Sequence, residues 1–177
     1  MYKQHPRTPT HIFLDNIPYF ITGAIYQHRR LLTQELKQQL QTIIQEKFLQ
    51  SSWQLQHWVI LDNHYHLMAM SGKGIELTAI MKHIHGSSAH LIIQETQCKR
   101  PVWWNYWDYC PRTEKDYFVH LNYLLNNPVK HGYVNSLYDY PFSSFHALIE
   151  SQGRDKLVQQ FKDYADYTHA DIFDVAN

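Results

Sequence analysis

Two histidines, His64 and His66, stand two residues apart in the run His64-Tyr65-His66-Leu67-Met68, which has the composition of a β-strand. Successive side chains of a strand point to opposite faces, so both imidazoles project from the same face. Two neutral imidazoles side by side on a rigid backbone can share one metal ion. With 13 histidines in 177 residues, about one His-x-His pair is expected by chance. Ordinary half-buried strand histidines are therefore the competing interpretation.

A tyrosine about sixty residues further on is a candidate nucleophile, because it lies in a predicted helix with other polar residues. At 100° per residue, four polar side chains fall within about 60° of one another: Asp116, His120, Tyr123 and Asn127. A second arc, about 130° away, is apolar and is predicted to be the core side: Tyr117, Leu121, Leu124 and Leu125. Tyr123 is therefore expected on the polar face. It is either an ordinary exposed tyrosine or a nucleophile whose i+4 neighbour, Asn127, completes a metal site.

The elements that must position these residues follow from periodicity and turn chemistry. Residues 10–15, 19–27, 53–61, 64–70 and 102–109 are predicted to be extended, and Asp62-Asn63 is predicted to be a hairpin turn. Helices are predicted from the Thr33 cap to about residue 49, over 75–96 with a weak point at 86–88, and from the 113–116 cap to about 126. Two short helices are predicted near the end, one reaching about residue 150 and one near 155–164.

This order of strands and helices predicts an α+β domain: a central antiparallel sheet with packed helices, arranged like ferredoxin or an RNA-recognition domain. Residues 1–150 are expected to form the domain and residues 151–177 an acidic helical C-terminal tail. Residues 1–130 hold 13 Lys and Arg against 9 Asp and Glu, whereas residues 131–177 hold 3 against 7. A mildly basic body allows a nucleic-acid partner, although a scattered solvated surface explains the charges equally well.

The rest of the composition is that of a soluble protein, with 44% hydrophobic and 18% charged residues. No apolar run reaches the length of a membrane span, and no apolar signal region follows the basic N-terminal residues. Cys98 and Cys110 match no metal or disulfide spacing and are expected to be free thiols in a reducing compartment. A cytoplasmic location without a membrane partner is therefore expected.

Three blocks of the sequence together resemble the REP-associated tyrosine transposases, a branch of the single-tyrosine HUH (insertion-sequence 200-like) transposase family. Residues 56–67, Gln-His-Trp-Val-Ile-Leu-Asp-Asn-His-Tyr-His-Leu, resemble the strand-turn-strand of that family. Residues 123–134, beginning Tyr-Leu-Leu-Asn-Asn-Pro-Val-Lys-His-Gly, resemble its tyrosine helix, and residues 140–146 resemble the C-terminal signature of the branch. The likeness runs from about residue 10 to 150.

The resemblance implies a transposase fold and a metal-dependent endonuclease and strand transferase that acts in DNA transposition. It implies that His64, His66 and Asn127 hold Mg²⁺ or Mn²⁺ and that Tyr123 is the nucleophile. The implied substrate is single-stranded DNA, in hairpin-forming repeats, and the implied intermediate is a 5′-phosphotyrosine with a free 3′-OH. Family members act as homodimers or as monomers, so the oligomeric state stays open.

The chain departs from the family pattern at two places. Leu61-Asp62 stands where relatives often carry Met-Pro, and the aromatic segment 103–110 lacks the basic residues that usually follow its first Trp. Its rings either stack on splayed bases or fill the core. The candidate DNA-binding residues are basic or aromatic: Lys82, Lys99, Arg100, Trp103, Trp104, Arg112, His120 and Lys130.

Two hypotheses about function therefore stand side by side. The first is an enzyme that forms a phosphotyrosine on single-stranded DNA. The second is a domesticated module of the same fold that grips structured single strands without cutting. The presence of all four residues His64, His66, Tyr123 and Asn127 favours the first. A third hypothesis, a metal phosphodiesterase that uses water, would make Tyr123 dispensable.

Overall fold

The computed structural model describes residues 11 and 13–169, and it contains one antiparallel sheet with the strand order β2-β3-β1-β4. The strands are β1 (Pro18–Ala24), β2 (Gln54–Ile60), β3 (His64–Met70) and β4 (Trp107–Tyr109). The α-helices are α1 (Gln34–Leu49), α2 (Leu77–Thr96), α3 (Glu114–Lys130), α4 (Phe145–Gln152) and α5 (Arg154–Asp163). Short 3₁₀ turns, including η3 (Leu137–Asp139) and η4 (Ala165–His169), lie between and after them. The predicted α+β class with a central antiparallel sheet is confirmed.

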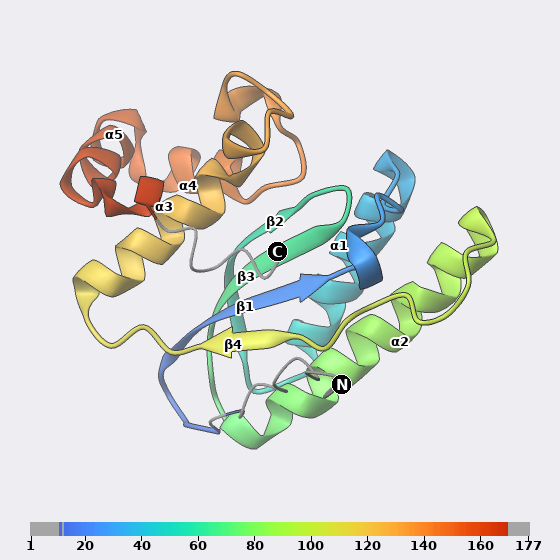
Figure 1. Cartoon of the computed structure of the whole chain (residues 1–177). Coiled ribbons are helices and arrows are strands. Elements are labelled where there is room, and N and C mark those ends of the chain that lie inside the picture. Colours follow the sequence, from blue (N-terminus) through green and yellow to red (C-terminus); the bar gives the residue numbers. More distant parts are fainter. Residues whose placement is uncertain (1–10, 12, 170–177) are drawn as a thin grey trace, which may run out of the picture.

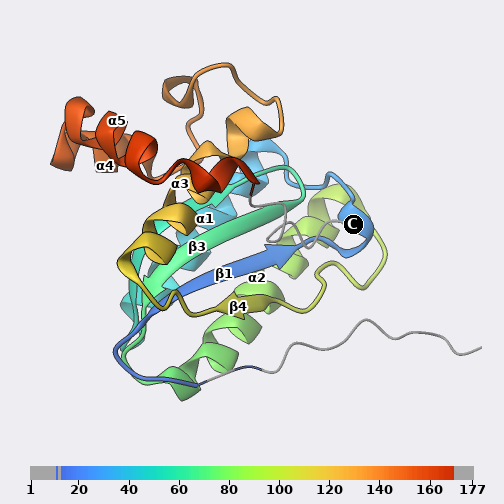
Figure 2. The same ribbon diagram turned by 60° about the vertical axis from the view of Figure 1, so that its left-hand side comes forward.

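The two faces of the sheet carry different helices. Figures 1 and 2 show α1 and α2 behind the sheet and α3, α4 and α5 on the other side. The first face is closed by apolar side chains at helical spacing in α1, such as Leu36, Leu40 and Ile44, which are buried with β-strand residues. The second face is closed by a separate cluster that includes Phe20 of β1 and Leu124 of α3. The sheet is therefore the middle of three layers.

Local signals in the sequence explain where several elements begin. The side chain of Thr33 accepts a hydrogen bond from the N–H of Leu36 at 3.2 Å and caps α1 as predicted. Thr113 caps α3 in the same way, accepting from the N–H of Asp116 at 3.1 Å. The turn between β2 and β3 is closed by the N–H of Leu61, which donates to the carbonyl of His64 at 2.8 Å. This hairpin fixes the start of the strand that carries both histidines.

The aromatic segment 102–109 was predicted to be one strand, and this prediction is wrong for most of its length. Only Trp107–Tyr109 forms a strand, and Trp103 makes one isolated bridge with Ile25. The reason is that the rings of Trp103 and Tyr106 turn into the core against α2. The indole N–H of Trp103 donates to Ser88 at 3.0 Å, and Tyr106 lies 3.4 Å from the hydroxyl of Thr78. These contacts draw the backbone out of the ladder.

Helix α2 runs unbroken through Gly86, the weak point of the predicted helix, because the backbone hydrogen bonds of a helix need no side chain. Two further element predictions differ from the structure. Helix α3 continues through Pro128 to Lys130 instead of ending near residue 126, because a proline removes only one N–H from the ladder. The expected extended segment 10–15 falls partly outside the described residues, and its described part forms no strand.

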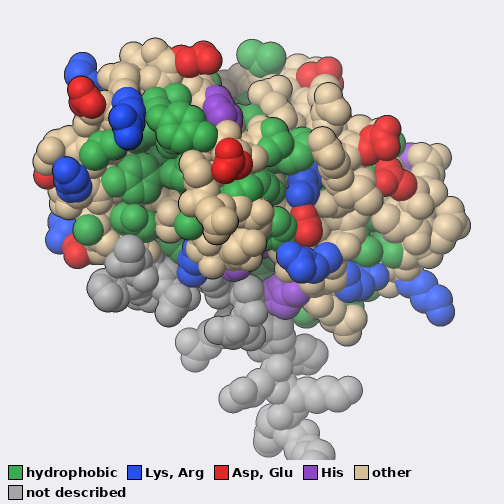
Figure 3. All heavy atoms as spheres, turned by 90° about the horizontal axis from the view of Figure 1, so that it is seen from above, with side chains coloured by type: hydrophobic (Ala, Val, Ile, Leu, Met, Phe, Trp, Pro, Cys, Tyr) green, Lys and Arg blue, Asp and Glu red, His purple; other side chains and the backbone are tan. Residues whose placement is uncertain are grey.

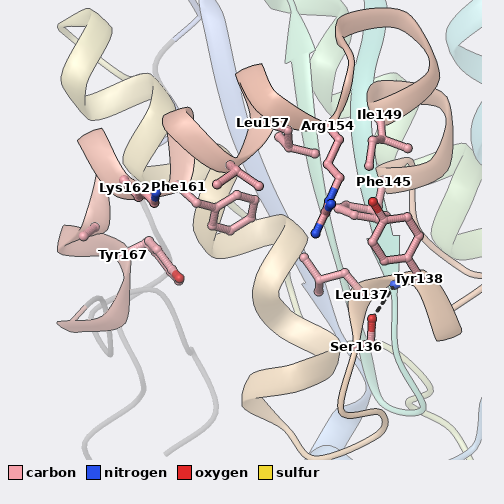
Figure 4. Close-up of a pocket in the computed structure, with 12 residues that line it drawn as sticks. Ser136, Leu137, Tyr138, Phe145, Ile149, Arg154, Leu157, Phe161, Lys162 and Tyr167 are labelled. Atoms are coloured by element: carbon pink, nitrogen blue, oxygen red, sulfur yellow. Dashed lines mark hydrogen bonds between the residues drawn. The ribbon is translucent and has the colours of Figure 1, made fainter.

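The C-terminal helices complete the second face. The side chains of Asn122 in α3 and Gln160 in α5 are joined by a 2.6 Å hydrogen bond, and Leu157 is buried beside α3. Between η3, α4 and α5 lies an apolar groove of about 540 Å³, with Arg154 and Lys162 among its lining residues (Figure 4). Figure 3 shows hydrophobic side chains gathered on this part of the surface. Within the described part of the chain, no helix is long and apolar enough to cross a membrane.

Candidate active site

Strand β3 and helix α3 bring His64, His66 and Asn127 together. Both histidines point to the face of the sheet that α3 crosses, as their spacing predicts. Their ring centroids are 5.0 Å apart. Nε2 of His64 lies 3.0 Å from Oδ1 of Asn127, and His66 and Asn127 are both 0% exposed. Three side chains that are predicted to be metal ligands therefore form one buried cluster.

Each histidine is held by a hydrogen bond at Nδ1, the ring nitrogen that is not proposed to bind the metal. Nδ1 of His66 lies 2.8 Å from Oγ1 of Thr22 in the neighbouring strand β1. Nδ1 of His64 lies 2.7 Å from Oδ1 of Asn63, which can only accept, so Nδ1 carries the proton and Nε2 keeps its lone pair. Hydrogen bonds of this kind fix the tautomer and orientation of metal-binding histidines.

Burial keeps His66 neutral. Its pKa lies well below the usual 6.5, first because burial disfavours the charged ring and then because His64, His131, Lys130 and His120 add positive charge nearby. A neutral imidazole is the form that binds a metal. The environment of His66 therefore favours the state that a ligand needs.

The polar atoms of the cluster fit a divalent cation. Nε2 of His66 and Nδ2 of Asn127 are buried and have no hydrogen-bond partner among the described residues. Nε2 of His64, with its lone pair, and Oδ1 of Asn127 face each other at 3.0 Å, and a cation bound by both atoms would remove the repulsion between these two acceptors. Amide oxygen is a ligand for Mg²⁺ and Mn²⁺, and imidazole nitrogen is a ligand for divalent transition metals. No group of three His, Cys, Asp or Glu side chains converges in the described ranges. The candidate metal site is this mixed set of two histidines and one asparagine.

Tyr123 lies beside the cluster but is buried, contrary to the expected exposed face of α3. It is 1% exposed, and its ring packs edge-on against His66 at 5.4 Å and against Phe20 at 6.1 Å. Nζ of Lys130 lies 4.8 Å from the ring centroid. The prediction failed because both arcs of α3 are buried: Tyr123 and the apolar residue Leu124 belong to one cluster with sheet residues such as Phe20.

His120 and Asp116 extend the polar arc along α3. Nδ1 of His120 lies 2.7 Å from the backbone oxygen of Asp116 and 3.1 Å from its carboxylate. Tyr109 of β4 stacks on the His120 ring at 4.7 Å and donates to the same carboxylate at 2.8 Å. Burial lowers the pKa of His120, and the contacts with Asp116 oppose this shift. His120 is therefore buried behind Tyr109 and does not lie open to solvent.

The turn that leads into β3 is tied to α1 and to the C-terminal segment. Lys37 of α1 is only 7% exposed, and its Nζ lies 2.6 Å from Oδ1 of Asp62. The rings of Tyr133, Tyr140 and Phe142 surround this ammonium group at 5.6, 5.6 and 5.3 Å. The hydroxyl of Tyr140 donates to the carbonyl of Ile60 at 2.7 Å. The block 140–146 thus contacts the turn that precedes His64.

The candidate DNA-binding residues are dispersed. Lys82, Lys99, Arg100, Arg112 and Lys130 are exposed, whereas His120 is buried. Trp104 is half-buried, 4.5 Å from the Tyr26 ring. Trp103 is 8% exposed and stacks on His85 at 4.7 Å, on the α2 side of the sheet. Lys130 and His120 lie close enough to add positive charge at His66, and the structure does not gather the other six around the histidines.

Sequence reasoning missed the residues that orient the site. Thr22 lies 44 positions before His66, and only the strand register reveals their contact. In the sequence, Lys37 has the features of an ordinary lysine on a helix surface. Only the folded chain shows that aromatic rings from the C-terminal segment enclose it. Asn63 stands next to His64, and its turn chemistry offered a usable signal.

The chain is similar to one protein family, to a relative from a known organism and to a solved structure. The model of the family described as "Transposase IS200 like" matches residues 15–118, which include His64 and His66 and end before Tyr123. The chain is 28% identical over 131 residues to the REP-associated tyrosine transposase of Escherichia coli (strain K12), covering 72% of this chain and 75% of that protein. A solved structure of a REP-associated tyrosine transposase bound to a REP hairpin matches with a TM-score of 0.70 and 25% identity, covering 84% of this chain and 87% of that one.

Proposed function

The chain belongs to the IS200-like transposase family, among the REP-associated tyrosine transposases, and we propose that it cuts and rejoins single-stranded DNA through a covalent bond to Tyr123. The observation that carries the proposal is the cluster of His64, His66 and Asn127 with Tyr123 packed against His66. These residues come from two elements that are distant in the sequence. Their convergence is what a metal-assisted nucleophilic site requires.

His64, His66 and Asn127 are proposed to hold the divalent cation, Mg²⁺ or Mn²⁺. When bound, the cation would supply positive charge against the oxygens of the scissile phosphate. Thr22 and Asn63 keep both imidazoles turned toward the same side. Burial keeps His66 in its neutral form, which has a lone pair to donate.

Tyr123 is proposed to be the nucleophile. Its phenol loses its proton, and Oη forms a bond to phosphorus while the bond to the 3′ oxygen breaks; that oxygen gains a proton. The products are a 5′-phosphotyrosine and a free 3′-OH. Because the energy of the phosphodiester is kept in the covalent bond, a 3′-OH can later attack phosphorus and release Tyr123 without a nucleotide cofactor.

The proposed substrate is DNA that forms hairpins with single-stranded flanks, because a similar solved protein is described as bound to a REP hairpin. Exposed basic residues such as Lys99, Arg100, Arg112 and Lys130 are proposed to contact its phosphates. We assign the catalytic unit to residues 1–150 and treat 151–177 as its C-terminal tail. The part of that tail described here packs on α3 through Leu157 and Gln160. Sizing the protein with and without DNA distinguishes a homodimer from a monomer.

The burial of Tyr123 favours one alternative, a module of this fold that binds DNA hairpins without cutting them. Tyr123 is 1% exposed, so a phosphate can reach its hydroxyl only if neighbouring side chains move. The two proposals differ in one product, the covalent complex.

A gel assay for covalent complexes tests the proposal. The protein is mixed with labelled hairpin oligonucleotides and Mn²⁺ and run under denaturing conditions, beside Tyr123→Phe and a chelator control. A labelled band at the mass of protein plus DNA, absent from both controls, is expected. Cleavage that survives in Tyr123→Phe would indicate a nuclease that uses water. Binding without cleavage would indicate the non-cutting module.

A further inference from the structure

Resting on the proposed function, we propose that Trp107 stacks on a base of the single-stranded DNA next to the scissile phosphate. Trp107 lies in β4, the strand at the free edge of the sheet beside β1. The proposal concerns a base-stacking position that is distinct from the metal cluster and from Tyr123.

Strand register places Trp107 on the same face as the histidines. Thr22 of β1 pairs with His66 of β3 on one side and with Trp107 of β4 on the other. Directly paired residues of neighbouring strands project from the same face. Thr22 contacts Nδ1 of His66, so its side chain marks that face as the one with the metal cluster. Trp107 is two strand spacings from His66, roughly 10 Å.

The residues that follow Trp107 confirm its direction. Tyr109, two positions on, stacks on His120 of α3 at 4.7 Å and therefore points to the α3 side of the sheet. Asp108 between them pairs with Ile21, whose side chain is buried in the opposite cluster. Alternation along β4 then puts Trp107 on the side of Tyr109.

Among the described residues, Trp107 differs from the other four tryptophans in having neither a ring stacked on it nor a place in a hydrophobic cluster. Trp53 and Trp103 are buried and donate their indole N–H to Lys73 and Ser88. Trp58 packs against the α1 and α2 cluster, and Trp104 packs on Tyr26. Trp107 is half-buried and belongs to neither hydrophobic cluster of the described residues.

Trp107 is half-buried, so part of its side chain faces solvent. Figure 1 shows β4 at the edge of the sheet, next to β1. A partly exposed indole without an aromatic neighbour among the described residues offers an apolar face at the edge of a polar site. Single-stranded nucleic acids are gripped by such faces because every base can stack on one. A base flanking the phosphate that is held between β3 and α3 is the ligand that this position fits.

The test measures binding without cleavage, so that it stands apart from the catalytic proposal. The full chain carrying Tyr123→Phe is titrated in chelator with hairpin oligonucleotides that have single-stranded flanks. Each oligonucleotide replaces one flanking base by 2-aminopurine or by an abasic site. We expect quenching of 2-aminopurine at one or two adjacent flank positions, and an affinity about 5- to 150-fold lower for Trp107→Ala. Trp107→Phe, which keeps an aromatic face, should lose less.

Two comparisons make the result decisive. An abasic site at the stacking position should weaken binding, and Trp107→Ala should then add no further loss. Trp58→Ala, on the opposite face of the sheet, should leave flank binding unchanged. The proposal is overturned if the protein with Trp107 intact binds all the abasic oligonucleotides equally well. It is also overturned if Trp107→Ala lowers the affinity for a hairpin without flanks as much as the affinity for a hairpin with flanks. The abasic scan needs no change at Trp107, so a variant that fails to fold does not block the test. Failure of the wild-type chain to cut DNA in Mn²⁺ would overturn the proposed function alone.

Discussion

Nε2 of His64 lies 3.0 Å from Oδ1 of Asn127, in a contact that joins strand β3 to helix α3 across 63 positions of sequence. The two groups are polar and buried, and such groups are costly to enclose unless they are paired. A cation placed among His64, His66 and Asn127 would satisfy the nitrogen of His66 that lacks a partner among the described residues. This relationship links the fold to the proposed chemistry.

Removing the amide of Asn127 tests its role as a ligand. Asn127→Ala should lower Mn²⁺ affinity by more than about 10-fold, because a two-histidine set without an oxygen donor is incomplete. Calorimetric titration with Mn²⁺ measures the affinity directly. Asn126→Ala is the matched control, since Asn126 is the half-buried neighbour on the same helix. Equal affinity in the two variants would count against Asn127 as a ligand.

The hydroxyl of Thr22 should raise the Mn²⁺ affinity of the site by orienting His66, although it is not itself a proposed ligand. Thr22→Val keeps the shape of the side chain but removes the hydrogen bond to Nδ1 of His66. We expect Mn²⁺ affinity to fall by roughly 10- to 100-fold, as for other groups that orient metal-binding histidines. Thr22→Ser should keep most of the affinity because it retains the hydroxyl. Wild-type affinity in Thr22→Val would show that the hydrogen bond orients nothing of importance.

Lys37 should matter for stability because it neutralises Asp62 inside an aromatic enclosure. Among the described residues, Lys37→Met leaves the Asp62 carboxylate, which is 29% exposed, with the more distant Arg30 at 3.5 Å as its salt-bridge partner. We expect a loss of about 1–3 kcal/mol in the free energy of unfolding, less than for a fully buried pair. Urea denaturation measures it, with exposed Lys156→Met as a control that should change little. Adding Asp62→Asn to Lys37→Met should recover part of the loss; a strictly additive double variant would contradict the coupling.

His85 should make the protein sensitive to acid. Burial lowers its pKa to about 3, and its Nε2 lies 2.8 Å from the hydroxyl of Tyr65. Below about pH 6.5 the unfolded chain takes up a proton at this position and the folded protein does not, so stability falls as the pH drops toward 3. The contribution is up to about 1.4 kcal/mol per pH unit.

The comparison of wild type with His85→Asn isolates this effect. Asparagine can accept the Tyr65 hydrogen bond but does not titrate, so the plot of unfolding free energy against pH should be less steep for the variant between pH 6 and 4. Identical slopes would contradict the assignment of acid sensitivity to His85.

Local chemistry in the sequence was enough to predict much of the fold. The Thr33 and Thr113 caps, the Asp62-Asn63 turn and the alternation that pairs His64 with His66 are signals carried by a few adjacent residues. Each of them appears in the structure close to its predicted place. The helical wheel also grouped His120, Tyr123 and Asn127 on one side of α3 correctly.

What the sequence could not provide were the contacts between distant elements. The burial of Tyr123 depends on the packing of α3 against the sheet and the C-terminal helices, which buries its polar arc as well as its apolar arc. The aromatic segment 102–109 has strand composition, but packing of Trp103 against His85 overrides that preference. Thr22 and Lys37 gain their roles only through the strand register and through the C-terminal segment that encloses Asp62.

Mass spectrometry of the covalent complex tests the central claim most directly. Trypsin should release residues 116–130, a peptide that holds two tyrosines, Tyr117 and Tyr123. After reaction with a hairpin oligonucleotide in Mn²⁺ and nuclease trimming, fragmentation should place the 5′-phosphonucleotide on Tyr123 and leave Tyr117 unmodified. A phosphonucleotide on Tyr117 or on any other residue, or cleaved DNA with no modified peptide, would contradict the account.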